Sequence, residues 1–163
     1  MSPELARIEE QLRTSFEGEA WHGPSVLEAL DGVTADEACQ HPIAKAHSIW
    51  ELVLHLAGTY QLVLRRLEGD ATPLAADDDW PTVPPPTDAN WRAATRALLE
   101  LNQDLRRSVS SFNAKKLDEP VVSTPLDSAY TQFIGITQHD LYHAGQIVLL
   151  KRALAARDQT VFR

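Results

Sequence analysis

The sequence predicts an all-α protein, built as a four-helix bundle with one long crossover loop. Apolar residues follow helical spacing over four long segments, whereas the two-residue alternation typical of strands is scarce. Two of the connections between these segments are long, as in bundles whose helices are not all joined by short turns. The 163 residues suit one domain with a single core, so we expect residues 1–163 to form a single domain.

The first long helix is predicted over roughly residues 3–16. Its apolar positions lie on one stripe: Leu5, Ile8, Leu12 and Phe16. Pro3 falls near the first turn, where its missing backbone N–H is tolerated. The next segment is rich in small and turn-forming residues, and only SVLEAL at its centre has the pattern of a short helix. We expect that helix to be capped by Ser25 and ended by Gly32.

The second long helix is predicted to begin near His47 or Ser48 and to continue to about Leu67, where Gly69 ends it. Ser48 and Glu51 are three residues apart and match a capping box, in which each side chain bonds to the backbone N–H of the other residue. The inward stripe of this helix is apolar except for one histidine and one threonine: Leu52, His55, Leu56, Thr59 and Val63.

The stretch from Gly69 to Asn90 is the least helical part of the chain. It holds half of the ten prolines and three consecutive aspartates, and we interpret it as a long crossover loop. Loops of this length in compact domains often act as lids or partner surfaces. Residues 77–79 and Trp80 could therefore cover a site or contact a second subunit; a solvated connector is the alternative.

The third helix is predicted over about residues 88–112. Its apolar residues recur every seven positions, as on a helix packed in a bundle: Trp91, Leu98, Leu105 and Phe112, with Ala94 and Leu101 between them. After a link containing two prolines, a fourth helix is predicted to begin near Leu126–Asp127 and to end near Ala155. Its inner stripe includes two histidines: Gln132, Ile136, His139, His143, Ile147, Leu150 and Leu154.

Charge and cysteine content exclude several classes of protein. The net charge is −8, and the basic residues form only isolated pairs, so we expect no nucleic-acid partner. Cys39 is the single cysteine, which excludes an intrachain disulfide and a cysteine-based metal cluster. The N-terminus lacks the apolar core of a signal peptide, and no apolar run approaches the ~20 residues of a membrane span. We expect a soluble, cytoplasmic protein without a membrane partner.

Three histidines fall on the inward stripes of two predicted helices. His139 and His143 are four residues apart, so their side chains lie one above the other on one helix face. His55 occupies an inward position on the second helix and can supply a third imidazole. Three neutral imidazoles, with a further coordination position left open, are the ligand set of a catalytic type of metal site. Such ligands suit zinc, nickel, cobalt or iron, and we expect a divalent transition metal, most readily zinc or nickel.

The alternative is that these histidines are ordinary core residues. A single buried histidine is more often hydrogen-bonded than metal-bound, and an HxxxH pair arises by chance. Three inward imidazoles are harder to satisfy by hydrogen bonds, since each one left unpartnered costs about 1–3 kcal/mol. The remaining histidines fit a ligand role less well: His47 lies two turns before His55, and His22 and His41 lie in turns, where His22 could line the mouth of a site.

Several polar residues near the three histidines could assist them. Glu51 and Thr59 lie one turn before and one turn after His55, and Gln146 lies close to the face of the HxxxH pair. Each could orient an imidazole or hold a water molecule, although Glu51 is better explained by the capping box. Asp140 follows the first histidine of HxxxH, where zinc peptidases have a longer glutamate, so a peptidase is disfavoured.

The motifs together resemble the DinB/YfiT-like superfamily of proposed metalloenzymes. The resemblance comprises WHGPSVLEALDGVTADEA followed by HSIWELVLHL, and then HDLYHAGQI in the last helix. It implies a four-helix bundle in an up-down-down-up arrangement and a divalent metal held by His55, His139 and His143. Relatives often form dimers, so a homodimer is implied. Some relatives are S-transferases that use bacillithiol, mycothiol or glutathione, and one branch isomerises maleylpyruvate with mycothiol.

Three functions are compatible with these features. The first is a metal-dependent enzyme, such as an S-transferase that joins a low-molecular-weight thiol to a small electrophilic substrate. The second is a metallohydrolase that uses hydroxide on the metal, with Glu51 or Asp140 as the base. The third is a non-catalytic module that binds a metal or ligand. No catalytic residue or thiol-binding residue is assigned from the sequence.

Overall fold

The computed structural model describes residues 2–21 and 23–161, and four long helices dominate it. These helices form the bundle: α1 (Pro3–Glu17), α4 (Ile49–Leu67), α6 (Asp88–Ser111) and α7 (Ala129–Val161). Shorter helical turns lie in the connections: α2 (Val26–Leu30), α3 (Ala35–Ala38), α5 (Ala76–Asp79) and the 3-10 turn η1 (Ala114–Lys116). Among the described residues, no helix combines the length and the apolarity needed to cross a bilayer.

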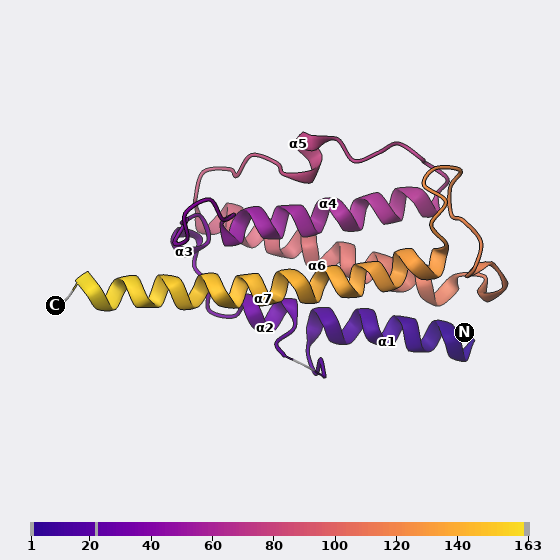
Figure 1. The fold of residues 1–163 in the computed structure, drawn as a ribbon, viewed down its shortest axis with the longest axis horizontal. Helices are drawn as coiled ribbons and strands as arrows, with labels where there is room; N and C mark the ends of the chain where they lie inside the picture. Colours follow the sequence, from indigo (N-terminus) through magenta and orange to yellow (C-terminus); the bar gives the residue numbers. More distant parts are fainter. Residues whose placement is uncertain (1, 22, 162–163) are drawn as a thin grey trace.

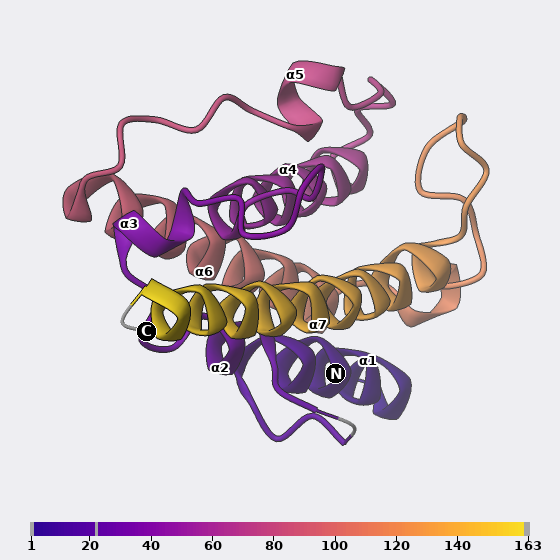
Figure 2. The same cartoon turned by 60° about the vertical axis from the view of Figure 1, so that its left-hand side comes forward.

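The bundle has the up-down-down-up arrangement. α1 and α7 run in one direction, while α4 and α6 run in the opposite direction (Figure 1). α1 packs on α6 and α7, and α4 packs on the same two helices. Because α4 and α6 are parallel, the chain between them returns along the bundle as a crossover segment (residues 68–87). This segment carries α5, which lies against α4 (Figure 2). The predicted all-α bundle with a long crossover is confirmed.

Capping residues set most helix boundaries where the sequence places them. Ser48 begins α4, its hydroxyl accepting from the backbone N–H of Glu51 while its own N–H donates to the Glu51 carboxylate at 2.6 Å. Ser25 forms the same box at the start of α2, which ends just before Gly32 as predicted. The single turns α3 and α5 were not predicted, because four residues are too few to show a helical period.

The last helix differs from its prediction at both ends. It begins at Ala129 rather than near residues 126–127, because the Ser128 hydroxyl accepts from the backbone N–H of Thr131 and acts as the cap. It continues past Ala155 to Val161. The apolar stripe ends at Leu154, but the residues that follow include neither proline nor glycine, so nothing in the local sequence stops the helix.

A buried polar cluster joins the four long helices inside the apolar core. The Asp140 carboxylate of α7 accepts hydrogen bonds from the Tyr60 hydroxyl of α4 at 2.8 Å and from the Ser15 hydroxyl of α1 at 3.0 Å. The Asn102 amide of α6 donates to the Tyr60 oxygen at 2.9 Å. Burial raises the pKa of Asp140 to about 7, against the lowering effect of its two hydrogen bonds.

Candidate metal centre

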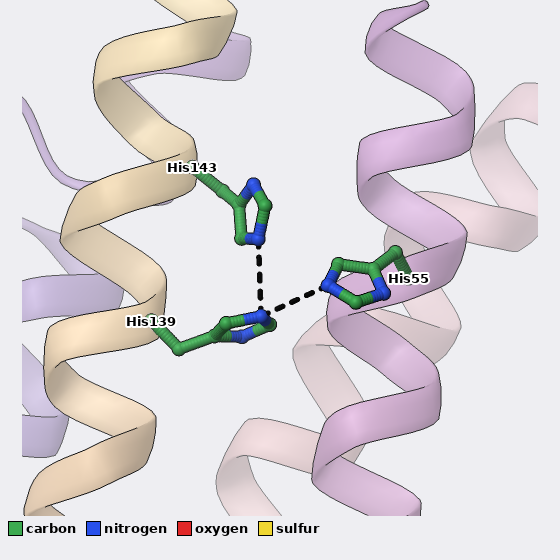
Figure 3. A group of neighbouring side chains, drawn as sticks. All are labelled: His55, His139 and His143. Atoms are coloured by element: carbon green, nitrogen blue, oxygen red, sulfur yellow. Dashed lines mark hydrogen bonds between the residues drawn. The ribbon is translucent and has the colours of Figure 1, made fainter. Parts of the chain in front are cut away.

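The three predicted histidines meet where α4 packs against α7. His55 projects from the first half of α4, and His139 and His143 project from successive turns of α7 (Figure 3). The Nε2 atom of His139 lies 2.9 Å from His55 Nε2 and 3.0 Å from His143 Nε2. The ligand atoms of the three rings all lie within 4.8 Å of one another. The structure therefore brings together the residues assigned as ligands, and their binding of a metal stays a prediction.

Two of the rings are oriented by acceptors on their outer nitrogens. His55 Nδ1 lies 3.0 Å from the main-chain oxygen of Asp79 and 2.9 Å from its carboxylate oxygen. His143 Nδ1 lies 2.7 Å from the amide oxygen of Gln146. These oxygens only accept hydrogen bonds, so each Nδ1 carries the proton. The Nε2 atoms of His55 and His143 consequently present lone pairs to the centre of the cluster.

This arrangement fits a metal ion better than it fits a hydrogen-bond network. His139 Nε2 faces two lone pairs but can donate at most one hydrogen, so one close contact stays unsatisfied without a cation. In a tetrahedral site with bonds of 2.0–2.1 Å, ligand nitrogens lie ~3.3 Å apart, close to the separations of 2.9 and 3.0 Å. His139 Nδ1 has no hydrogen-bond partner among the described residues, so packing alone holds that ring.

Burial keeps the α7 imidazoles in the form that binds metals. Burial, with smaller contributions from the neighbouring rings of His143 and His55, lowers the pKa of His139 to about 3. Burial also lowers the pKa of His143, against the raising effect of its hydrogen bond to Gln146. Both rings are therefore neutral at pH 7, and binding a cation does not require a proton to be removed from them.

The crossover segment covers one ring of the histidine cluster, that of His55. The Trp80 indole lies parallel to the His55 ring, with centroids 4.1 Å apart, and its other neighbour is the His47 ring at 3.6 Å. Gly58 of α4 permits this close approach, because a Cβ at that position would lie only 2.6 Å from the main-chain oxygen of Asp78. The proposed covering role of residues 77–80 thus has a structural basis, with Asp79 and Trp80 making the contacts.

The other polar residues near the site have varied roles. Gln146 orients an imidazole, as the sequence suggested. Thr59 donates to the main-chain oxygen of His55 within its own helix. Glu51 accepts from Ser48 and from the His41 ring at 2.9 Å, so the capping interpretation holds. His22 lies outside the described residues.

The specific contact of Asp79 with His55 was missed by sequence reasoning. Three consecutive aspartates offered equivalent carboxylates, and the only available signal was the position of a tryptophan directly after the third of them. Which of the three carboxylates reaches the His55 ring depends on how the crossover segment lies on α4. The sequence of that segment has no periodicity from which its path could be predicted.

The fold and the site together define an all-helical protein with a histidine cluster that could hold a metal ion. The chain belongs to the DinB superfamily: the family model of that description matches residues 20–147, which is most of the chain. Comparisons with curated proteins and with solved structures find no match.

Proposed function

We propose that this protein binds a divalent transition metal, zinc or nickel, through His55, His139 and His143. We further propose that it transfers a low-molecular-weight thiol to a small electrophilic molecule. The observation that carries the proposal is the convergence of three Nε2 atoms while the Nδ1 atoms of His55 and His143 are committed to oxygen acceptors. Membership of the DinB superfamily supports a metal-dependent role.

The chemistry requires few other groups from the protein. A divalent ion acts as a Lewis acid and lowers the pKa of a thiol that coordinates it. In the overall reaction a sulfur–carbon bond forms and the bond from that carbon to its leaving group breaks. The leaving group departs with the electron pair, and the thiol proton passes to solvent. The chain contributes the orientation of the imidazoles through Asp79 and Gln146, and the cover over one of them through Trp80.

A hydrolase is less well supported, because both carboxylates considered as its base are engaged elsewhere. Glu51 caps α4 and contacts His41. Asp140 is fully buried and is hydrogen-bonded to Tyr60 and Ser15. Asp79 is close to the cluster, but its carboxylate faces His55 Nδ1 and serves to orient that ring. A non-catalytic binding module remains the outcome if no thiol binds.

Elemental analysis of protein purified without a histidine tag tests the metal. We expect a ratio of metal to chain near one, lost in His143→Ala and retained in His41→Ala, whose ring lies in an exposed turn. Metal-loaded protein is then titrated calorimetrically with bacillithiol, mycothiol and glutathione. Absence of metal in the unaltered protein would overturn the metal proposal. Metal without binding of any of the three thiols would reject the transferase and leave the binding module.

A further inference from the structure

A small apolar cavity lies one helical turn from the histidine cluster. It has a volume of about 250 Å³ and lies between the start of α4, the segment before it and the second half of α7. Its lining is mostly apolar and includes Ala46, Leu52, Leu149 and Leu150, with His47 and Gln146 as the polar residues.

Two of the lining residues connect this cavity to the cluster. Gln146 lines the cavity and also accepts from His143 Nδ1 at 2.7 Å. His47 lines it and stacks on Trp80, which in turn stacks on His55. The Gln146 amide therefore separates the cavity from the histidines. Its oxygen is used on the histidine side, while its NH2 group makes no hydrogen bond with the described residues and can donate to a ligand.

We propose that this cavity binds a compact, neutral apolar group of the substrate, such as an aryl ring or a short branched alkyl chain. A polar reactive group attached to it then lies beside the histidine cluster. The proposal deepens the proposed function, on which it rests, by assigning a substrate class. The volume suits one ring rather than a complete large ligand, since sites for drug-sized molecules begin at ~300 Å³.

The lining also argues against an anionic group at this position. No lysine or arginine lines the cavity, so a buried carboxylate or phosphate would have no opposite charge, and burial without one is costly. The larger hollows include two, of about 540 and 570 Å³, that lie along α1 and are lined partly by charged residues such as Glu9, Arg106 and Arg7. Among the described residues, no hydrogen bond, ion pair or ring contact joins their linings to the three histidines, unlike the lining of the small cavity.

The test uses fluorine NMR with two probes that share one ring. The neutral probe is 4-fluorobenzyl alcohol and the anionic probe is 4-fluorobenzoate, both titrated into the metal-free full-length chain. We expect the alcohol to bind at least about tenfold more tightly than the anion, because the cavity offers no counter-charge. Ala46→Phe, which fills the cavity, should weaken binding of the alcohol at least about tenfold. Ala97→Phe, on the exposed face of α6, should not change it.

A second pair of variants keeps the test decisive if Ala46→Phe fails to fold. Leu149→Ala removes a partly exposed wall of the cavity and should weaken binding of the alcohol about threefold or more. Leu126→Ala, at an exposed leucine elsewhere, should have no effect. If Ala46→Phe binds the alcohol as tightly as Ala97→Phe does, or Leu149→Ala as tightly as Leu126→Ala, the assignment of the cavity is overturned, whatever the metal content.

Cobalt-loaded protein tests whether the bound ring lies beside the metal. Once elemental analysis shows cobalt in the chain, we expect the fluorine relaxation of the bound alcohol to be faster than with zinc, because cobalt(II) is paramagnetic. Unchanged relaxation in protein that holds cobalt would overturn the placement beside the cluster. If the chain holds none of zinc, nickel and cobalt, the proposed metal function fails, and the metal-free titrations alone decide whether the cavity binds the ring.

Discussion

Replacing Gly58 by alanine should weaken metal binding without weakening the fold. A Cβ at this position would lie 2.6 Å from the main-chain oxygen of Asp78, whereas ordinary van der Waals contact begins at 3.4 Å, so the crossover segment must move by about 0.8 Å. The adjacent Asp79 oxygens now lie 3.0 and 2.9 Å from His55 Nδ1. A shift of that size takes them beyond hydrogen-bonding distance. Loss of such an outer partner typically lowers metal affinity 10–100-fold, or by about 1.4–2.7 kcal/mol.

The assay compares affinity and stability in the same variant. Zinc affinity is measured by competition with a chromophoric chelator, and the free energy of unfolding of the metal-free chain by urea denaturation. Alanine in a helix interior is favoured over glycine by about 1 kcal/mol, which opposes the local clash, so unfolding should change little. Gly135→Ala, with nothing within 4 Å of its added Cβ, is the matched control and should leave zinc affinity unchanged. Wild-type zinc affinity in Gly58→Ala would refute the coupling between the crossover segment and His55.

Three further substitutions separate the roles of neighbouring groups. Asp79→Asn removes the carboxylate charge beside His55 and should lower zinc affinity about tenfold. The control Asp77→Asn should leave zinc affinity unchanged. Equal zinc affinities of the two variants in the chelator competition would contradict the role of the Asp79 carboxylate. Tyr60→Phe removes a hydroxyl donor from buried Asp140 and should lower the free energy of unfolding by about 1–3 kcal/mol. Zinc affinity should not change, and a fall in zinc affinity would argue against a purely structural role for Tyr60. Glu51→Ala should cost about 1 kcal/mol near pH 7 through loss of the cap. Burial alone would raise the pKa of Glu51, but hydrogen bonds from Ser48 and His41 outweigh it and lower the pKa below the usual 4.5. The stabilisation is therefore present above pH 4.5 and is lost as the pH falls through the lowered pKa. Urea titrations that show the same difference in unfolding free energy at every pH would refute the assignment.

The ligand positions could be predicted because they share the periodicity of the helices that carry them. His139 and His143 fall on the same 3.6-residue stripe as Ile136 and Ile147. Because these apolar neighbours face the core, the two histidines are predicted to face it as well. His55 follows from the stripe of α4 in the same manner. The long helices were predictable for the same reason, as were the caps Ser25 and Ser48, since period and capping are local properties of the chain.

The surroundings of the cluster depend on long-range contacts and were less predictable. Asp79 lies 24 residues from His55 along the chain, in a segment without periodicity. Asp140 is adjacent to His139, but successive residues on a helix point about 100° apart. Its carboxylate therefore enters the core beside Tyr60 and Ser15 instead of joining the histidines. The identity of those partners depends on how two other helices, α4 and α1, pack against α7, which no local pattern encodes.

The parallel pairing of α4 and α6 has a consequence for how this site can diversify. The chain must travel back along all 19 residues of α4, a distance of ~28 Å at 1.5 Å per residue, before α6 can begin. His55 lies about a third of the way along α4, and the returning segment places Asp79 and Trp80 beside it. The return that the topology requires thus supplies the cover in this chain. Insertions or deletions in residues 68–87 could alter which molecules reach the histidines, and the helices that position those histidines would not need to change.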